Sequence, residues 1–245
     1  EFSGNTMEDD AILKLPEDQI GSLGTGNSFI GSGGTGSILV ESEYSLNISE
    51  DQYWRAFDAP YIMDGEFDVL AEVTIEPGAV FKFTEEGHLD IEDEDGSLIA
   101  VGTADKPIKF LGTQEEAGHW IGINIETNDP NNELKYTQVS HAESNVNIKG
   151  GGSAKINNSV FSMAESYGVE VDRNGALQEF IGNTLEDDAI LKLPEDQIGS
   201  LGAGNSFIGS GGTGSILVES EYSLSIAEDQ YWRAFDAPYV MDGEF

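Results

Sequence analysis

The chain has 245 residues, of which 46 are acidic and 11 basic, so its formal net charge is −35 at pH 7. This charge excludes nucleic acid and anionic membrane surfaces as partners, and the absence of cysteine excludes disulfides and thiolate metal sites. Because 38% of the residues are hydrophobic, the chain is predicted to fold, and since no apolar run reaches the roughly 20 residues that span a bilayer, no membrane insertion is expected.

The beginning of the chain recurs at its end. Residues 1–67 align with residues 179–245 at a constant offset of 178, without a gap. Six positions differ: Ser3/Ile181, Met7/Leu185, Thr25/Ala203, Asn47/Ser225, Ser49/Ala227 and Ile62/Val240. The chain is therefore predicted to be one 178-residue period and part of the next, cut from a longer array, with residues 1–67, 68–178 and 179–245 forming one continuous solenoid.

Short runs of alternating apolar and polar residues predict strands, because apolar residues do not recur at helical spacing. The candidate strands, in chain order, are residues 11–15, 37–41, 80–83, 88–92, 98–101, 108–111, 121–126, 145–148, 155–161 and 168–171. Turn residues separate them, as at Glu76-Pro77-Gly78 and Asp95-Gly96.

Many short strands fit either an antiparallel sandwich or barrel, or a parallel β-helix. The length of the period favours the β-helix, because a period of 178 residues would contain about eight coils of about 22 residues each. Asn residues at turn-like positions add a second indication, since their side chains can hydrogen-bond from coil to coil in a ladder. They are Asn5, Asn27, Asn157, Asn158 and Asn183. The alternative is that Asn is simply common in turns.

A resemblance to a known family covers roughly residues 72–185. Residues 73–112 read VTIEPGAVFKFTEEGHLDIEDEDGSLIAVGTADKPIKFLG, followed by GHWIGI at 118–123 and INNSVF at 156–161. This text resembles the right-handed parallel β-helix repeats of large bacterial secreted and surface proteins of the adhesin type. The resemblance implies an all-β, pectate-lyase-like solenoid in an extracellular or cell-surface protein. It says less about function, because many activities share this scaffold.

Acidic clusters are the candidate metal sites. If Leu89 and Ile91 point inward, the alternate side chains of residues 88–92 point outward on one face and the acids continue into the next turn. Carboxylates placed in this way could bind Ca²⁺ or carbohydrate, or form a solvated surface. The candidate Ca²⁺ ligands are Asp90, Glu92, Asp93, Asp95, Asp9, Asp10, Asp187 and Asp188. Zinc is not expected, because the three His residues lack ligand spacing.

Aromatic pairs are the candidate glycan contacts: Tyr53 and Trp54, with their copies Tyr231 and Trp232. Their rings could stack on sugars, or cover a hydrophobic edge between periods.

No catalytic motif is found in the sequence, and its three Arg residues do not favour a lyase, which needs a basic side chain as the catalytic base. The expected function is a non-enzymatic stalk or adhesive rod that requires no cofactor, with Ca²⁺ as an optional stabiliser. Its expected partners are neighbouring repeats of the same chain and a cell-surface or polysaccharide target. The alternative is a polysaccharide-binding or -cleaving module, a lyase or hydrolase.

Overall fold

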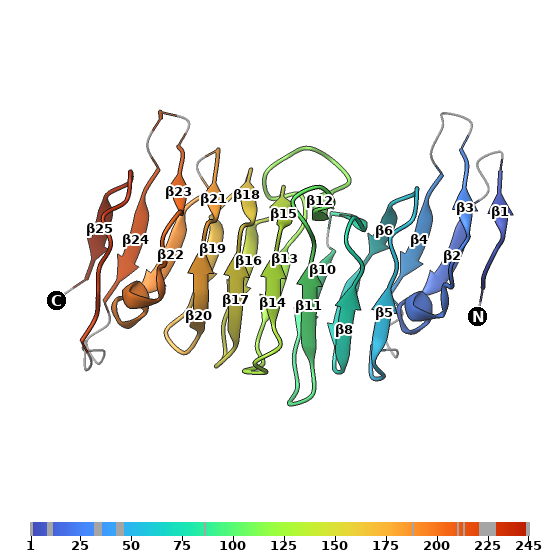
Figure 1. The fold of residues 1–245 in the computed structure, drawn as a ribbon, viewed down its shortest axis with the longest axis horizontal. Coiled ribbons are helices and arrows are strands. Elements are labelled where there is room, and N and C mark those ends of the chain that lie inside the picture. The colour runs from blue at the N-terminus through green and yellow to red at the C-terminus, as the bar shows by residue number, and fades with distance from the viewer. Residues whose placement is uncertain are drawn as a thin grey trace.

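The chain forms a stack of parallel strands along one axis, with its two ends at opposite ends of the stack (Figure 1). The computed structural model describes residues 2–8, 12–31, 36–42, 47–85, 87–187, 189–209, 211–212, 214–220 and 229–243. Helix within these residues is limited to two 3₁₀ helices, η1 (Glu17–Ser22) and η2 (Glu195–Ser200). The molecule is therefore an all-β parallel solenoid of about nine turns, which confirms the predicted fold class.

The strands of the described residues form four parallel sheets, of which three run along the stack and the fourth has two strands. The nine-stranded sheet contains β2 (Leu13–Pro16), β4 (Ile38–Glu41), β6 (Tyr61–Asp64), β9 (Val80–Phe83), β12 (Ile108–Gly112), β15 (Thr137–Ser140), β18 (Val160–Ser162), β21 (Thr184–Leu185) and β23 (Ser206–Phe207). The eight-stranded sheet contains β7 (Glu66–Val69), β10 (His88–Ile91), β13 (Gly122–Ile125), β16 (Ser144–Ile148), β19 (Tyr167–Val171), β22 (Leu191–Pro194), β24 (Ile216–Glu219) and β25 (Tyr239–Asp242). The six-stranded sheet contains β5 (Gln52–Trp54), β8 (Glu72–Ile75), β11 (Ser97–Val101), β14 (Glu133–Lys135), β17 (Ser153–Asn157) and β20 (Ala176–Ile181). The two-stranded sheet contains β1 (Thr6–Met7) and β3 (Ser28–Phe29).

Each expected strand has a counterpart in the described residues, most with ends shifted by one or two positions. The exception is the expected strand 155–161, which is two strands, β17 and β18. The backbone turns between them at Asn158, whose φ is 53°. Asn tolerates this left-handed conformation better than most residues, so it ends one strand and redirects the chain into the next sheet.

The coils differ in length because their corners differ. Glu66 pairs with His88 at the coil length that the sequence suggested, but His88 pairs with Gly122 only after a longer coil. The corner between β6 and β7 is Gly65 alone, whose φ of 110° suits a tight turn. The corner between β12 and β13, in contrast, is a loop over residues 113–121.

One period makes seven turns and part of an eighth, instead of the expected eight. Each turn of the solenoid adds one strand to the nine-stranded sheet, and β21 is the seventh strand after β2 in this sheet. The copy of β2 is not β21 but β22, the next strand along the chain, which lies in the eight-stranded sheet. The period therefore ends one sheet further around the axis than it began.

Inward side chains stack from coil to coil to form one continuous core. Along the nine-stranded sheet, the ring of Phe81 lies 5.0 Å from that of Tyr61 and 5.4 Å from that of Phe110, within 15° of parallel. Phe83 and Trp120 stack at 4.2 Å in the same way. All five side chains are buried, so each coil buries its apolar face mainly against its two neighbours.

A buried polar ladder follows one corner of the solenoid. The side-chain oxygen of Asn183 accepts a hydrogen bond from the Ser159 amide at 3.0 Å, and the Asn183 amide donates in turn to the side chain of Asn205 at 2.9 Å. In the first copy, the amide of Asn5 donates to the side chain of Asn27 at 3.0 Å. The predicted Asn ladder is therefore confirmed at these positions.

The two copies of the repeated sequence make the same local contacts. The side chain of Asn27 donates to the carbonyl of Phe2 at 2.6 Å, and that of Asn205 donates to Phe180 at 2.9 Å. The amide of Gly21 donates to the Gln52 side chain at 2.8 Å, and the equivalent bond from Gly199 to Gln230 measures 3.1 Å. The repeated sequence thus specifies its own coil geometry in both places.

The copies nevertheless join different sheets. Strands β2, β4 and β6 belong to the nine-stranded sheet, whereas their copies β22, β24 and β25 belong to the eight-stranded sheet. Strands β1 and β3 form the two-stranded sheet, whereas their copies β21 and β23 end the nine-stranded sheet. The shift follows from the incomplete eighth turn, because every strand of the second copy enters the stack one sheet further around the axis than its original.

Candidate functional site

The acidic face lies on the outer side of the eight-stranded sheet, on β7 and β10. The register sets His88 beside Glu66 and Asp90 beside Asp68. Leu89 is buried and the residues on either side of it point outward, as expected from the alternation. The parallel register therefore gathers carboxylates from two coils around one imidazole.

Three side chains of this face approach one another closely enough to share a cation. His88 Nε2 lies 3.3 Å from Glu66 Oε1 and 3.6 Å from Asp90 Oδ2, and one ligand atom from each residue lies within 4.8 Å of the others. From the next coil, β13, Asn124 Nδ2 donates a hydrogen bond to Asp90 Oδ1 at 2.6 Å and holds this carboxylate in place. Carboxylate oxygens suit Ca²⁺, whereas an imidazole nitrogen beside them also suits transition metals such as Zn²⁺.

Crowding of like charge perturbs two further acids on the acidic face. Partial burial raises the pKa of Asp68, and the neighbouring carboxylates of Glu66 and Asp90 raise it further. Partial burial and the charges of Asp68, Asp90 and other acids likewise raise the pKa of Glu92. The folded state therefore holds these protons more tightly than the unfolded chain, so these groups favour folding less as the pH rises through the raised pKa values. A bound cation would relieve this repulsion.

The other expected Ca²⁺ ligands that the structure describes do not belong to the group of Glu66, His88 and Asp90. Asp93 and Asp95 are exposed in the turn after β10, and Asp187 is exposed in the turn after β21. Asp9, Asp10 and Asp188 lie outside the described residues. Among the expected ligands within the described residues, only Asp90 belongs to the three-residue group.

Glu66 and His88 were not among the ligands predicted from the sequence. The prediction considered carboxylates along one strand, whereas Glu66, His88 and Asp90 come together between strands of successive coils. The signal was the coil length, because Glu66 precedes His88 by the spacing expected for one turn.

The aromatic pairs differ sharply in exposure between the two copies. Trp54 is 1% exposed, with its ring 5.4 Å from that of Phe81, so it is a core residue that no glycan can reach. Its copy Trp232 is 41% exposed. The tyrosines are open in both copies, and an arginine guanidinium lies 5.2 Å from each ring centre, Arg55 over Tyr53 and Arg233 over Tyr231. The expected glycan contact at Trp54 is therefore corrected to Tyr53 alone in the first copy.

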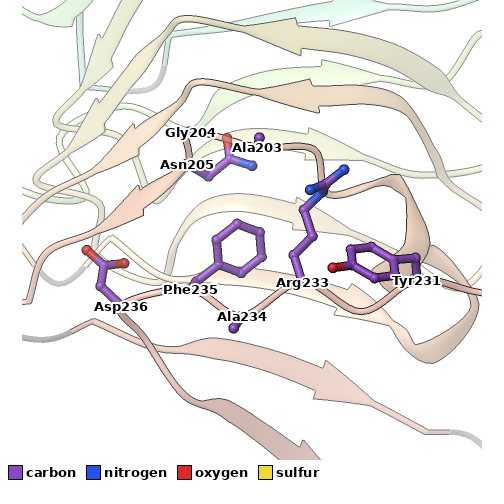
Figure 2. A pocket seen from close by; sticks show the side chains of 8 residues that line it. All are labelled: Ala203, Gly204, Asn205, Tyr231, Arg233, Ala234, Phe235 and Asp236. Carbon is purple, nitrogen blue, oxygen red and sulfur yellow. The ribbon is translucent and has the colours of Figure 1, made fainter.

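A hollow of about 490 Å³ adjoins the second aromatic pair. It is lined by Ala203, Gly204, Asn205, Tyr231, Arg233, Ala234, Phe235 and Asp236. Figure 2 shows the Phe235 ring between the side chains of Asp236 and Arg233. Asp236 and Asn205 already bond to the protein, Asp236 to Ser206 at 3.2 Å and Asn205 to the Phe180 carbonyl at 2.9 Å. The Tyr231 ring and the Arg233 guanidinium are left as the groups best placed to meet a sugar or a carboxylate.

None of the helices in the described part of the chain has the length and apolar character of a membrane span. Comparison of the chain with protein-family models, with curated proteins and with solved structures gave no match.

Proposed function

We propose that the chain is a rigid, non-enzymatic repeat segment, a stalk or adhesive rod, of a large bacterial extracellular or cell-surface protein. The observation that carries the proposal is the second copy of the repeat. It reproduces the contacts of the first copy and continues the same stack of coils, so one period leads into the next without a break. A protein whose task is to span distance gains from such periods, because each added period lengthens it.

The physical basis for stiffness is the continuous core. Successive coils are held by parallel pairing throughout, and in places also by stacked aromatic rings or by the Asn ladder, so bending would separate contacts along a whole side of the stack. The location outside the cell rests on the resemblance of residues 73–112 to repeats of bacterial surface proteins.

Arrays of one, two and three 178-residue periods test the rod. With seven turns and part of an eighth to a period and about 4.8 Å between rungs, each period is expected to add about 35 Å to the maximum dimension measured by small-angle X-ray scattering. Equal increments support a rigid rod. Increments that shrink with each added period indicate flexible linkage between periods and contradict the proposal.

Calcium is the proposed stabiliser of this rod at the acidic face. Binding to the folded state alone is expected to raise the midpoint of thermal unfolding by about 5–10 °C when free Ca²⁺ is roughly 100 times its dissociation constant. Calorimetry at matched ionic strength measures this, and Asp90→Asn, which keeps the side-chain shape, should remove the rise. An equal rise with NaCl would mean simple screening, and a rise with Zn²⁺ alone would reassign the site to an imidazole-binding metal.

The second candidate function is a polysaccharide-binding or -cleaving module, which the exposed Tyr231 ring with the Arg233 guanidinium over it favours. Binding or cleavage of uronate or neutral glycans that disappears in Tyr231→Ala would support it over the rod.

A further inference from the structure

We propose that the loop over residues 113–121, between β12 and β13, is a pH-sensitive switch, closed while His141 is neutral and opened when His141 takes up a proton in mild acid. The inference concerns one corner of the solenoid and depends neither on the rod role nor on calcium. It rests on two buried imidazoles, on the hydrogen bonds that they make, and on the backbone bonds that hold the loop closed.

The end of the loop is held by the chain at and after the end of β15, one coil later. Backbone hydrogen bonds of 2.7 to 3.4 Å join residues 118–120 to residues 141–143. The indole of Trp120 also donates a hydrogen bond to the Ser140 carbonyl at 2.8 Å. The closed position of the loop therefore depends on the conformation of the chain around residue 141.

His141 fixes this conformation through its ring. Its backbone turns sharply, with a φ of 73°, and its Nδ1 accepts a hydrogen bond from the Gly112 amide at 3.3 Å. An amide N–H can only donate, so Nδ1 carries no hydrogen and the neutral ring has its hydrogen on Nε2. A further proton must then go to Nδ1, where two donors would face each other and the bond to Gly112 would be lost.

A second imidazole leaves the His141 ring little room to turn away. Gly112 lies between the two rings, because a Cβ atom at this position would lie 2.9 Å from Cδ2 of His119 and 3.1 Å from Cβ of His141. His119 Nε2 in turn lies 2.8 Å from Thr113 Oγ1. Both histidines are 8% exposed, so little water is available to solvate a charged ring while the loop is closed.

The surrounding charges do not remove this penalty. Burial lowers the pKa of His141 below its ordinary value of 6.5, the Glu115 carboxylate raises it in part, and His119 and Lys82 lower it further. Glu165, from the following coil, lies against the loop itself. Because the closed loop lowers this pKa, the open loop binds more protons, so closure weakens as the pH falls below the ordinary value.

Amide hydrogen exchange of the full chain at about pH 7.5 and 5.5 tests the switch. The amides of Gly118, His119 and Glu143 are bonded across the closed loop. After correction for the intrinsic effect of pH, we expect them to exchange about tenfold faster at the lower pH, which is one pH unit below the ordinary pKa of histidine. The amides of β17 and β19 should change little, which separates opening of the loop from unfolding of the stack.

The decisive variant is His141→Asn. Its side-chain oxygen can take the place of Nδ1 as acceptor for the Gly112 amide, asparagine tolerates the left-handed φ, and the side chain does not titrate. The acceleration in acid should therefore disappear. The matched control is His119→Gln, which removes the neighbouring histidine and should keep the acceleration.

No acceleration in the native chain, or an equal acceleration in His141→Asn, overturns the proposal. An acceleration lost in His119→Gln and kept in His141→Asn assigns the proton to His119 and overturns the choice of His141.

Nitrogen NMR of the His141 ring in the native chain keeps the proposal falsifiable even if a substitution weakens the loop. The expected result at about pH 7.5 is a hydrogen on Nε2 and none on Nδ1. A hydrogen on Nδ1 at this pH, or a doubly protonated ring with the Gly112 amide still protected at about pH 5.5, overturns the switch.

Discussion

Replacement of Phe81 with alanine is expected to lower the free energy of unfolding by about 3–5 kcal/mol. Phe81 is fully buried, and its ring lies within 5.4 Å of the ring centres of Trp54, Tyr61 and Phe110. The substitution removes the middle of this aromatic stack, and because the neighbouring rungs are fixed by backbone pairing, the cavity cannot close easily. Urea unfolding followed by circular dichroism measures the loss.

The control for Phe81→Ala is Tyr231→Ala, which removes an aromatic ring that is 70% exposed. This change should alter the free energy of unfolding by less than about 0.5 kcal/mol. Equal effects of the two substitutions would contradict the continuous aromatic core.

Asn183→Ala is expected to lower the free energy of unfolding by about 2–3 kcal/mol. The Asn183 side chain is fully buried, accepts from the Ser159 amide at 3.0 Å and donates to the Ile156 carbonyl at 2.8 Å. Alanine leaves both backbone groups buried without these partners, and an unsatisfied buried group carries its full desolvation penalty. Thermal and urea unfolding of the variant measure the cost.

The matched control is Asn131→Ala, at an exposed loop position. It should be close to neutral. A loss for Asn183→Ala no larger than that of the control would mean that the ladder is a by-product of turn preference, the alternative reading of these asparagines.

The strands and the fold class could be predicted from the sequence because their signals are local. Alternation at Leu89 and Ile91 assigns an inner and an outer face, and the tandem copy indicates stacked coils. The number of turns in a period could not be predicted, since it depends on how much chain each corner takes. Gly65 alone makes one corner and residues 113–121 make another, and alternation patterns do not report this difference.

The candidate site was predictable only in part, for a similar reason. Asp90 was placed on the correct face, but its partner Glu66 comes from the previous coil, and the longer coil between His88 and Gly122 made the coil spacing irregular. The burial of Trp54 could not be predicted from the sequence either, because the Phe81 ring that packs against it comes from the next coil of the chain.

The incomplete eighth turn of each period also determines how a longer array displays its surface. Three long sheets surround the axis and the second copy enters one sheet further around, so successive periods are offset by one of the three sheets. The exposed Tyr53 with Arg55 over its ring, and the copy of this pair, Tyr231 with Arg233, therefore face different sides of the stack. A third period would present the pair on the remaining side, and a fourth would return it to the first. An array of this kind offers the same surface chemistry on all three sides of its axis.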